Sequence, residues 1–156
     1  MQGMASSWRM NHVQVTVPQG ALSGNYSAIK EFYCDALGFS PIQISAFQDV
    51  HVFLTTDSSG GQFIYVSENA NPMVVRADDH VGFHLPARAE VDRVLKLCKR
   101  VRERDPRMEI QELDDLDLPQ TLTHSFYFRY LLPLWFDIQV IEPNSGHEPG
   151  NQQRIS

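Results

Sequence analysis

Two histidines open two similar segments of this sequence, and they are its first candidates for chemistry. Residues 11–18 read NHVQVTVP and residues 79–86 read DHVGFHLP, so His12 and His80 hold equivalent positions. Such a repeat predicts two similar modules, whose pseudo-symmetry can bring the two imidazoles together. A lone histidine is more often a surface or hydrogen-bonded structural residue, but its recurrence leaves metal ligation equally open.

Each histidine stands at the start of an expected strand. Residues 11–18 alternate apolar and polar side chains, which is typical of a strand with one face on the core and the other at water or a cavity. An amphipathic helix is expected from Ile29 to Leu37, with Gly38 as its C-cap. Three short strands are expected at 42–47, 50–56 and 62–67, followed by a linker at 68–78.

The second half repeats this order. A strand at 80–85 precedes a helix with an apolar stripe from Val91 to Val101, and three further strands are expected at 108–113, 123–130 and 134–141. The order is βαβββ twice, an α+β fold. We expect one domain over residues 10–142, with modules at 10–70 and 78–142 and flexible termini at 1–9 and 143–156.

This arrangement resembles the vicinal oxygen chelate superfamily, which includes glyoxalases, extradiol dioxygenases, and fosfomycin and bleomycin resistance proteins. The segments that carry the resemblance are NHVQVTVP, IKEFYCDALGF, DHVGFHLP with EVDRVLKL, and FYFRYLLPLWFDIQVIE. The resemblance implies that two mixed sheets form one cup-shaped domain, with helices outside and metal ligands projecting inward. It also implies a homodimer, because family members often complete their cups by pairing or exchanging modules.

The resemblance further implies a metal site made of His12, His80 and Asp137. The histidines match the family's first-strand ligands, and Asp137 stands where the last strand normally carries glutamate. Two imidazoles and a carboxylate suit Fe(II), Mn(II), Zn(II) or Ni(II) and leave positions open for substrate or oxygen. The fourth family position falls on Tyr65, or on Gln62 if the register shifts. A tyrosine there is a poor neutral ligand but a reasonable proton donor.

Several of these residues also have plain structural interpretations. Asp137 is one methylene shorter than glutamate and could pair with Arg129 across the expected hairpin. His84 shares a strand face with His80, so it could serve as an acid or base, or only line the cup. The Asp-Pro-x-Gly turn common in the family is replaced by residues 130–133. The aromatic side chains that fit a cavity wall, or simply the core, are Phe47, Phe53, Phe63, Phe126, Phe128 and Trp135.

Composition narrows the class of protein. A net charge of −6 over 156 residues argues against a nucleic-acid surface, which needs a basic stripe. No apolar run is long enough to span a bilayer, and no cleavable leader is visible, so no membrane partner is expected. Cys34 and Cys98 fall on the apolar sides of expected helices rather than in a disulfide framework, which favours a reduced cytoplasmic protein.

The sequence therefore predicts a metalloenzyme of the vicinal oxygen chelate type, a lyase, isomerase or dioxygenase that binds a small oxygenated substrate. In this hypothesis His12, His80 and Asp137 hold the metal, while Tyr65 and His84 assist proton transfer. The alternative is a metal-free protein that sequesters a small molecule, as the bleomycin resistance proteins do. A third hypothesis is an accessory domain that acts through protein contacts.

Overall fold

A computed structural model describes residues 10–46, 49–57, 59–76 and 78–144, without the side chains of residues 42–51 and 53. The chain divides into two compact units, Met1–Val74 and Val75–Ser156. The termini expected to be flexible lie almost wholly outside the described residues. So do Phe47 and the side chain of Phe53, two members of the expected aromatic wall.

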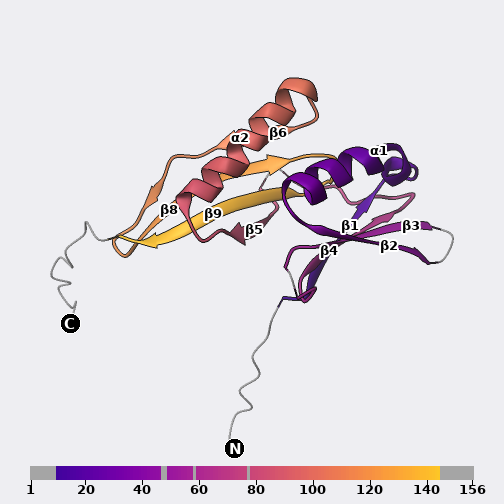
Figure 1. Ribbon diagram of the computed structural model, residues 1–156, viewed down its shortest axis with the longest axis horizontal. Helices are drawn as coiled ribbons and strands as arrows, with labels where there is room; N and C mark the ends of the chain where they lie inside the picture. Colours follow the sequence, from indigo (N-terminus) through magenta and orange to yellow (C-terminus); the bar gives the residue numbers. More distant parts are fainter. Residues whose placement is uncertain (1–9, 47–48, 58, 77, 145–156) are drawn as a thin grey trace, which may run out of the picture. The chain divides into compact units, whose positions relative to one another are not determined.

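Unit 1 is a four-stranded mixed sheet with one helical segment (Figure 1). Its elements are β1 (His12–Val17), α1 (Ala21–Ile29), η1 (Lys30–Ala36), β2 (Ser40–Ala46), β3 (Asp49–Thr55) and β4 (Phe63–Glu68). The strand order is β1-β4-β3-β2. Strand β1 runs parallel to β4, and the other neighbours are antiparallel. This unit therefore has the expected βαβββ order.

The helical segment of unit 1 is longer than its apolar periodicity predicts. It begins at Ala21 rather than near Ile29, because the Glu68 carboxylate of β4 accepts hydrogen bonds from the backbone N–H groups of Gly20 and Leu22, both at 2.8 Å. From Lys30 the segment continues as a π-helix. It stops where expected, since Gly38 adopts a φ of 84° and donates its N–H to the Cys34 carbonyl.

The core of unit 1 lies on one face of its sheet. Buried side chains of β1, β3 and β4 meet those of the helical segment there: Val15, Val17, Val52, Leu54, Ile64, Val66, Leu22, Ile29, Phe32 and Tyr33. The alternation of β1 leaves the side chains of His12, Gln14 and Thr16 on the opposite face. The predicted strand with one core face and one polar face is therefore confirmed.

Unit 2 is a five-stranded mixed sheet with one long helix. Its elements are β5 (His80–His84), α2 (Arg88–Arg104), β6 (Glu109–Glu112), β7 (Leu116–Asp117), β8 (Thr121–Arg129) and β9 (Trp135–Pro143). The strand order is β5-β9-β8-β6, with β5 parallel to β9 and the short β7 paired with β8. Strand β7 was expected to be part of an acidic loop; it pairs with β8 because the chain reverses between them, at residues 118–121.

The core of unit 2 lies between α2 and the sheet. The predicted stripe of α2 is confirmed, because Val91, Val94 and Cys98 are buried. They face β8 and β9, where Phe128 and Phe136 stack at 4.9 Å between ring centroids. Phe126 and Phe128 thus belong to the core under α2 rather than to a wall on the opposite face. No helix among the described residues is long and apolar enough to cross a membrane.

Candidate functional site

The face of the unit 2 sheet that points away from α2 carries a row of polar side chains. Strand registers align Gly82 on β5 with Asp137 on β9, and Asp137 with Tyr127 on β8. The neighbouring rows hold His80 beside Trp135 on one side, and His84, Gln139 and Ser125 on the other. Because side chains alternate along each strand, all of these project from the same face, which we call the open face of unit 2.

Asp137 lies at the centre of this open face. Its exposed fraction is 7%, and its Oδ1 atom has no hydrogen-bond partner among the described residues. Its Oδ2 atom lies 3.9 Å from Nε2 of His80. Burial raises the pKa of Asp137 above its usual value, and the nearby His80 only partly opposes this. A buried carboxylate in such a setting is suited to hold a cation.

The expected alternative pairing of Asp137 with Arg129 is wrong. Arg129 donates from Nε and Nη2 to the two oxygens of Glu109 on β6, each at 2.9 Å. Its guanidinium also lies 4.9 Å from the centre of the Trp135 ring. The reason is register, since Glu109 is the direct cross-strand partner of Arg129 on β6.

His80 is oriented so that one ring nitrogen stays available. Its Nδ1 lies 2.9 Å from the backbone oxygen of Asp78, which can only accept, so Nδ1 carries the proton and donates it. In the neutral ring Nε2 then has a free lone pair, on the side of Asp137. The ring rests against Tyr127 at 4.9 Å. Partial burial raises the pKa of Tyr127, helped by the negative charges of Asp137 and Asp78.

His12 in unit 1 has the same arrangement. Its Nδ1 lies 2.9 Å from Oδ1 of Asn11, and Asn11 is fixed in turn because its Nδ2 donates to the Gly61 carbonyl at 2.8 Å. The His12 ring stacks on Phe63 at 5.0 Å. Its Nε2 is therefore the nitrogen with the free lone pair. In both repeats an oxygen acceptor just before the histidine selects the same tautomer.

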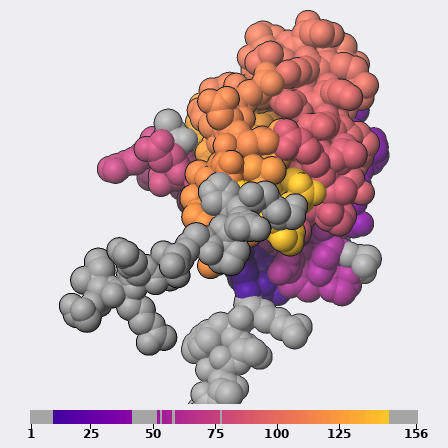
Figure 2. Space-filling view, turned by 90° about the vertical axis from the view of Figure 1, so that its left-hand side faces the viewer, coloured from indigo at the N-terminus to yellow at the C-terminus, as the bar shows by residue number. Residues whose placement is uncertain are grey.

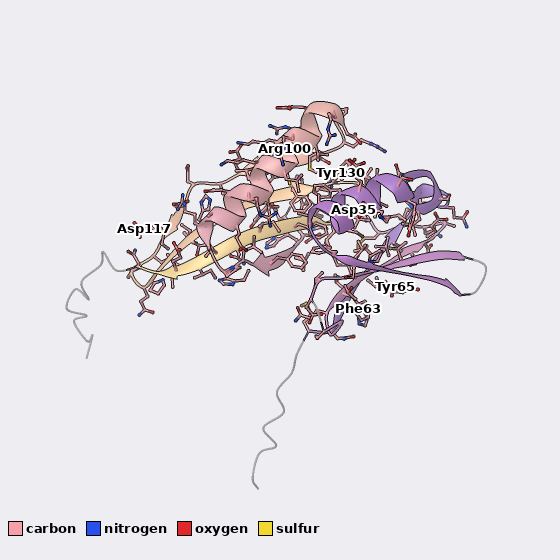
Figure 3. The ribbon with its side chains drawn as sticks, viewed as in Figure 1. Asp35, Phe63, Tyr65, Arg100, Asp117 and Tyr130 are labelled. Atoms are coloured by element: carbon pink, nitrogen blue, oxygen red, sulfur yellow. The ribbon has the colours of Figure 1, made fainter. Side chains whose placement is uncertain are left out.

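Tyr65 shares the face of unit 1 that carries His12. It is paired with Gln14, two residues along β1 from His12, and lies with Phe63 on the side of the sheet opposite α1 (Figure 3). Gln62 precedes β4, and its Nε2 donates to the Met10 carbonyl at 3.4 Å. By position, Tyr65 rather than Gln62 accompanies His12.

Gly82 provides space beside Asp137. A Cβ atom at this position would lie 3.2 Å from Nε2 of Gln139 and 3.9 Å from Oδ2 of Asp137. Because glycine has no side chain, the polar ends of Gln139 and Asp137 can both extend over β5. His84 follows on the same face and is exposed. Sequence reasoning did not single out Gly82, Tyr127 or Gln139. Alternation along β5 and β9 places Gly82 on the face of His80 and Gln139 on the face of Asp137, whereas the register of β8 with β9 aligns Tyr127 with Asp137.

The described residues contain no group of three or more His, Cys, Asp or Glu side chains close enough to hold a metal ion. Unit 2 by itself presents one imidazole nitrogen and one carboxylate, from His80 and Asp137. Unit 1 presents a second imidazole nitrogen, from His12.

A family model identifies the class of protein. The model of the Glyoxalase/Bleomycin resistance protein/Dioxygenase superfamily matches residues 9–110, about two thirds of the chain. The chain therefore belongs to this superfamily, which confirms the resemblance seen in the sequence. The matched region contains His12 and His80, whereas Asp137 lies beyond it. No curated protein matches the sequence.

Solved structures support the same fold. The fosfomycin resistance protein FosX from Listeria monocytogenes is similar with a TM-score of 0.57 and 16% identity, covering 86% of this chain and 91% of FosX. A FosX mutant complexed with Mn(II) and 1S,2S-dihydroxypropylphosphonic acid has a TM-score of 0.56 and 14% identity, covering 88% of this chain and 93% of the mutant. An integron cassette protein from V. cholerae has a TM-score of 0.53 and 17% identity, covering 88% of this chain and 98% of that one. At these identities the likeness establishes the glyoxalase-type α+β fold and nothing finer.

Proposed function

We propose that this protein is a metal-dependent enzyme of its superfamily, a lyase, isomerase or dioxygenase that acts on a small oxygenated molecule. The proposed metal ligands are His12, His80 and Asp137. The observation that carries the proposal is the buried Asp137 carboxylate, whose Oδ1 has no hydrogen-bond partner in the described part of the chain and whose Oδ2 lies 3.9 Å from Nε2 of His80. A buried carboxylate is costly unless it is paired or binds a metal.

The donor atoms fit a divalent ion. In both histidines Nδ1–H donates to an oxygen acceptor, which leaves the Nε2 lone pair able to bind a metal ion. Two imidazoles and one carboxylate suit Fe, Mn, Zn or Ni. When bound, such an ion supplies Lewis acidity toward a substrate oxygen. FosX, a protein of this fold, was crystallised with Mn(II).

The remaining predicted roles belong to the chain's own side chains. We assign Tyr65 as a proton donor because its phenol shares the face of His12. We assign His84 to proton transfer because it is exposed on the open face of unit 2, next to the row of Asp137. The ring of Phe63 shields one side of His12 from water.

The proposal also includes the wider architecture. It takes residues 10–142 as one domain whose two modules share a cup, and it takes the protein to be a cytoplasmic homodimer. These parts rest on the superfamily membership and on the two cysteines, which are both free thiols. The proposed partner is a small molecule rather than nucleic acid, as the net charge of −6 suggests.

Metal analysis tests the proposal. The protein should be purified without an affinity tag or chelator, and its transition metals should be counted by mass spectrometry. We expect about one ion per chain, and we expect His12→Ala, His80→Ala and Asp137→Asn each to lose it. His84→Ala is the matched control and should keep the metal, because His84 is not a proposed ligand.

Two results would contradict the metalloenzyme. One is a native protein that contains no metal and takes up none of Fe(II), Mn(II), Zn(II) or Ni(II). The other is a metal content that the three ligand variants leave unchanged. The first result would favour the metal-free binding protein, which also agrees with the aspartate in the place of the family's glutamate.

A further inference from the structure

On the open face of unit 2, two buried polar side-chain atoms have no hydrogen-bond partner among the residues that the structure describes, and one of the two belongs to a proposed metal ligand. They are Oδ1 of Asp137 and Nε1 of Trp135. Trp135 is 3% exposed, and it precedes Asp137 by two residues on β9, so both side chains project from the same face. One atom is an acceptor and the other can only donate.

The side chain of Arg129 holds the Trp135 ring in place. The Arg129 guanidinium lies 4.9 Å from the ring centre, and Arg129 is itself fixed by its two hydrogen bonds to Glu109. A cation over the ring is attracted to the π-system but leaves the indole N–H free to donate elsewhere. A buried tryptophan N–H normally has a partner, so an unpartnered one beside the proposed metal ligand points to a ligand atom.

Charge limits what that ligand can be. On the open face of unit 2, strands β5, β6, β8 and β9 place a single lysine or arginine, Arg129, which is already paired with Glu109. In unit 1 the described strands β1 to β4 contain no lysine or arginine. Phosphonates and phosphates are usually bound by such cations. The described strands therefore offer them no unpaired cation.

We propose that Trp135 is a specificity-determining residue whose indole N–H binds an oxygen of an uncharged hydroxyl- or carbonyl-bearing substrate beside Asp137. The proposal deepens the proposed function and rests on it for the position of the substrate. The site then selects neutral oxygenated molecules against phosphonates, in contrast to the FosX mutant that was crystallised with a dihydroxypropylphosphonic acid.

A matched pair of probes tests this selectivity. The first probe is 1S,2S-dihydroxypropylphosphonic acid, and the second is its dimethyl ester, which keeps the diol and removes the charge. Binding should be measured by titration calorimetry on chelator-treated protein, so that no metal ion attracts the phosphonate. We expect the ester to bind more tightly than the acid under this condition. Tighter binding of the acid would overturn the selectivity for uncharged substrates.

Variants at Trp135 test the hydrogen bond. Trp135→Phe should weaken binding of the ester about fivefold, as expected for one lost neutral hydrogen bond. Phenylalanine is also smaller than tryptophan, so a second variant should carry the tryptophan analogue β-(3-benzothienyl)alanine at Trp135. Because the analogue would also replace Trp8, the other tryptophan of the chain, this variant should be made in a Trp8→Phe background. The benzothienyl side chain keeps the ring shape but has sulfur in place of N–H, and it should weaken binding by a similar factor. Trp8→Phe alone is the control and should bind as the wild type does.

The outcomes separate this inference from the proposed function. If the benzothienyl variant binds the ester as tightly as the Trp8→Phe protein, the indole N–H has no role and the inference fails, whatever the metal content. If the protein takes up no metal but the ester still binds through Trp135, the metalloenzyme fails and the role of Trp135 stands.

Discussion

Asp137 is a single residue that marks a candidate site, because its buried carboxylate has little hydrogen bonding from the described residues. Its carboxylate is buried, its Oδ1 has no partner among the described residues, and Arg129, the cation on the neighbouring strand, is engaged by Glu109. Native proteins tolerate such a group mainly where function requires it. His80 lies too far away for a hydrogen bond, at 3.9 Å. The metal-free protein should therefore be less stable because of Asp137.

We predict that Asp137→Asn raises the melting temperature of the chelator-treated protein at pH 7 by about 2–8 °C, if the burial cost of about 1–3 kcal/mol is largely relieved. The direction of this change in melting temperature follows from the pKa of Asp137, which burial raises. A group with a raised pKa in the folded state lowers stability once pH rises above its unfolded pKa. The gain should therefore fade toward pH 3 in calorimetric scans. A lower melting temperature at pH 7 would show that the carboxylate is already compensated.

Gly82 supports a second prediction about single residues. Gly82→Val should reduce metal uptake, because its side chain would crowd the Asp137 carboxylate, whose Oδ2 is 3.9 Å from even a Cβ atom at this position. Gly82→Ala is the milder control, since its Cβ meets only the flexible end of Gln139 within 3.4 Å. Circular dichroism should show both variants folded. Equal metal content in the two variants would mean that Asp137 does not need this space.

At the scale of elements, a charged network joins α2 to the strands that follow it. Arg88 and Asp92 project from α2, and His124 on β8 lies 2.7 Å from Asp115 and 3.0 Å from Asp92. Arg88 contacts the same Asp115 carboxylate at 2.6 Å. Figure 2 shows α2, in salmon, beside the orange segment that holds β7 and β8. His124 and the acidic residues around Asp115 carry no predicted function, and their contacts here are structural.

This network predicts how the stability of the protein changes as the pH falls. Hydrogen bonds from Arg88, and secondly from His124, lower the pKa of Asp115. A lowered carboxyl pKa contributes stability that is present above the unfolded pKa and is lost as pH falls through the folded one. Below about pH 5 the melting temperature of the wild type should fall more steeply than that of Asp115→Asn. Asp114→Asn, in the same loop, is the control and should follow the wild type. Parallel curves for all three proteins would count against the network.

At the scale of the whole molecule, the two units share more than a fold. Each begins with a strand whose first residue is a histidine, and in each an oxygen acceptor just before it fixes Nδ1. In both histidines the ring nitrogen left able to bind a metal ion is therefore Nε2. The proposed function therefore depends on both units serving the same ion.

A double-mutant cycle tests this dependence. We predict that His12→Ala and His80→Ala each weaken Mn(II) binding, and that the double variant is weaker by less than the sum of the two effects. Ligands of one ion act as a unit, with coupling of about 0.5–3 kcal/mol. The affinities can be measured by titration calorimetry. Additive effects would place the two histidines at independent sites.

The amino-acid sequence by itself determined the order of the elements, the core faces of the strands and the equivalence of His12 and His80, because periodicity and repetition are local properties of a chain. It also marked Asp137, through the family pattern of the last strand. Only the tertiary structure decided which atoms meet. Glu68 on a distant strand extends the start of α1, Glu109 on β6 binds Arg129 in place of Asp137, and the register of β5 with β9 brings His80 to 3.9 Å from the buried carboxylate. These depend on which strands pair and in what register, and pairing joins residues too distant in sequence for any local pattern to relate.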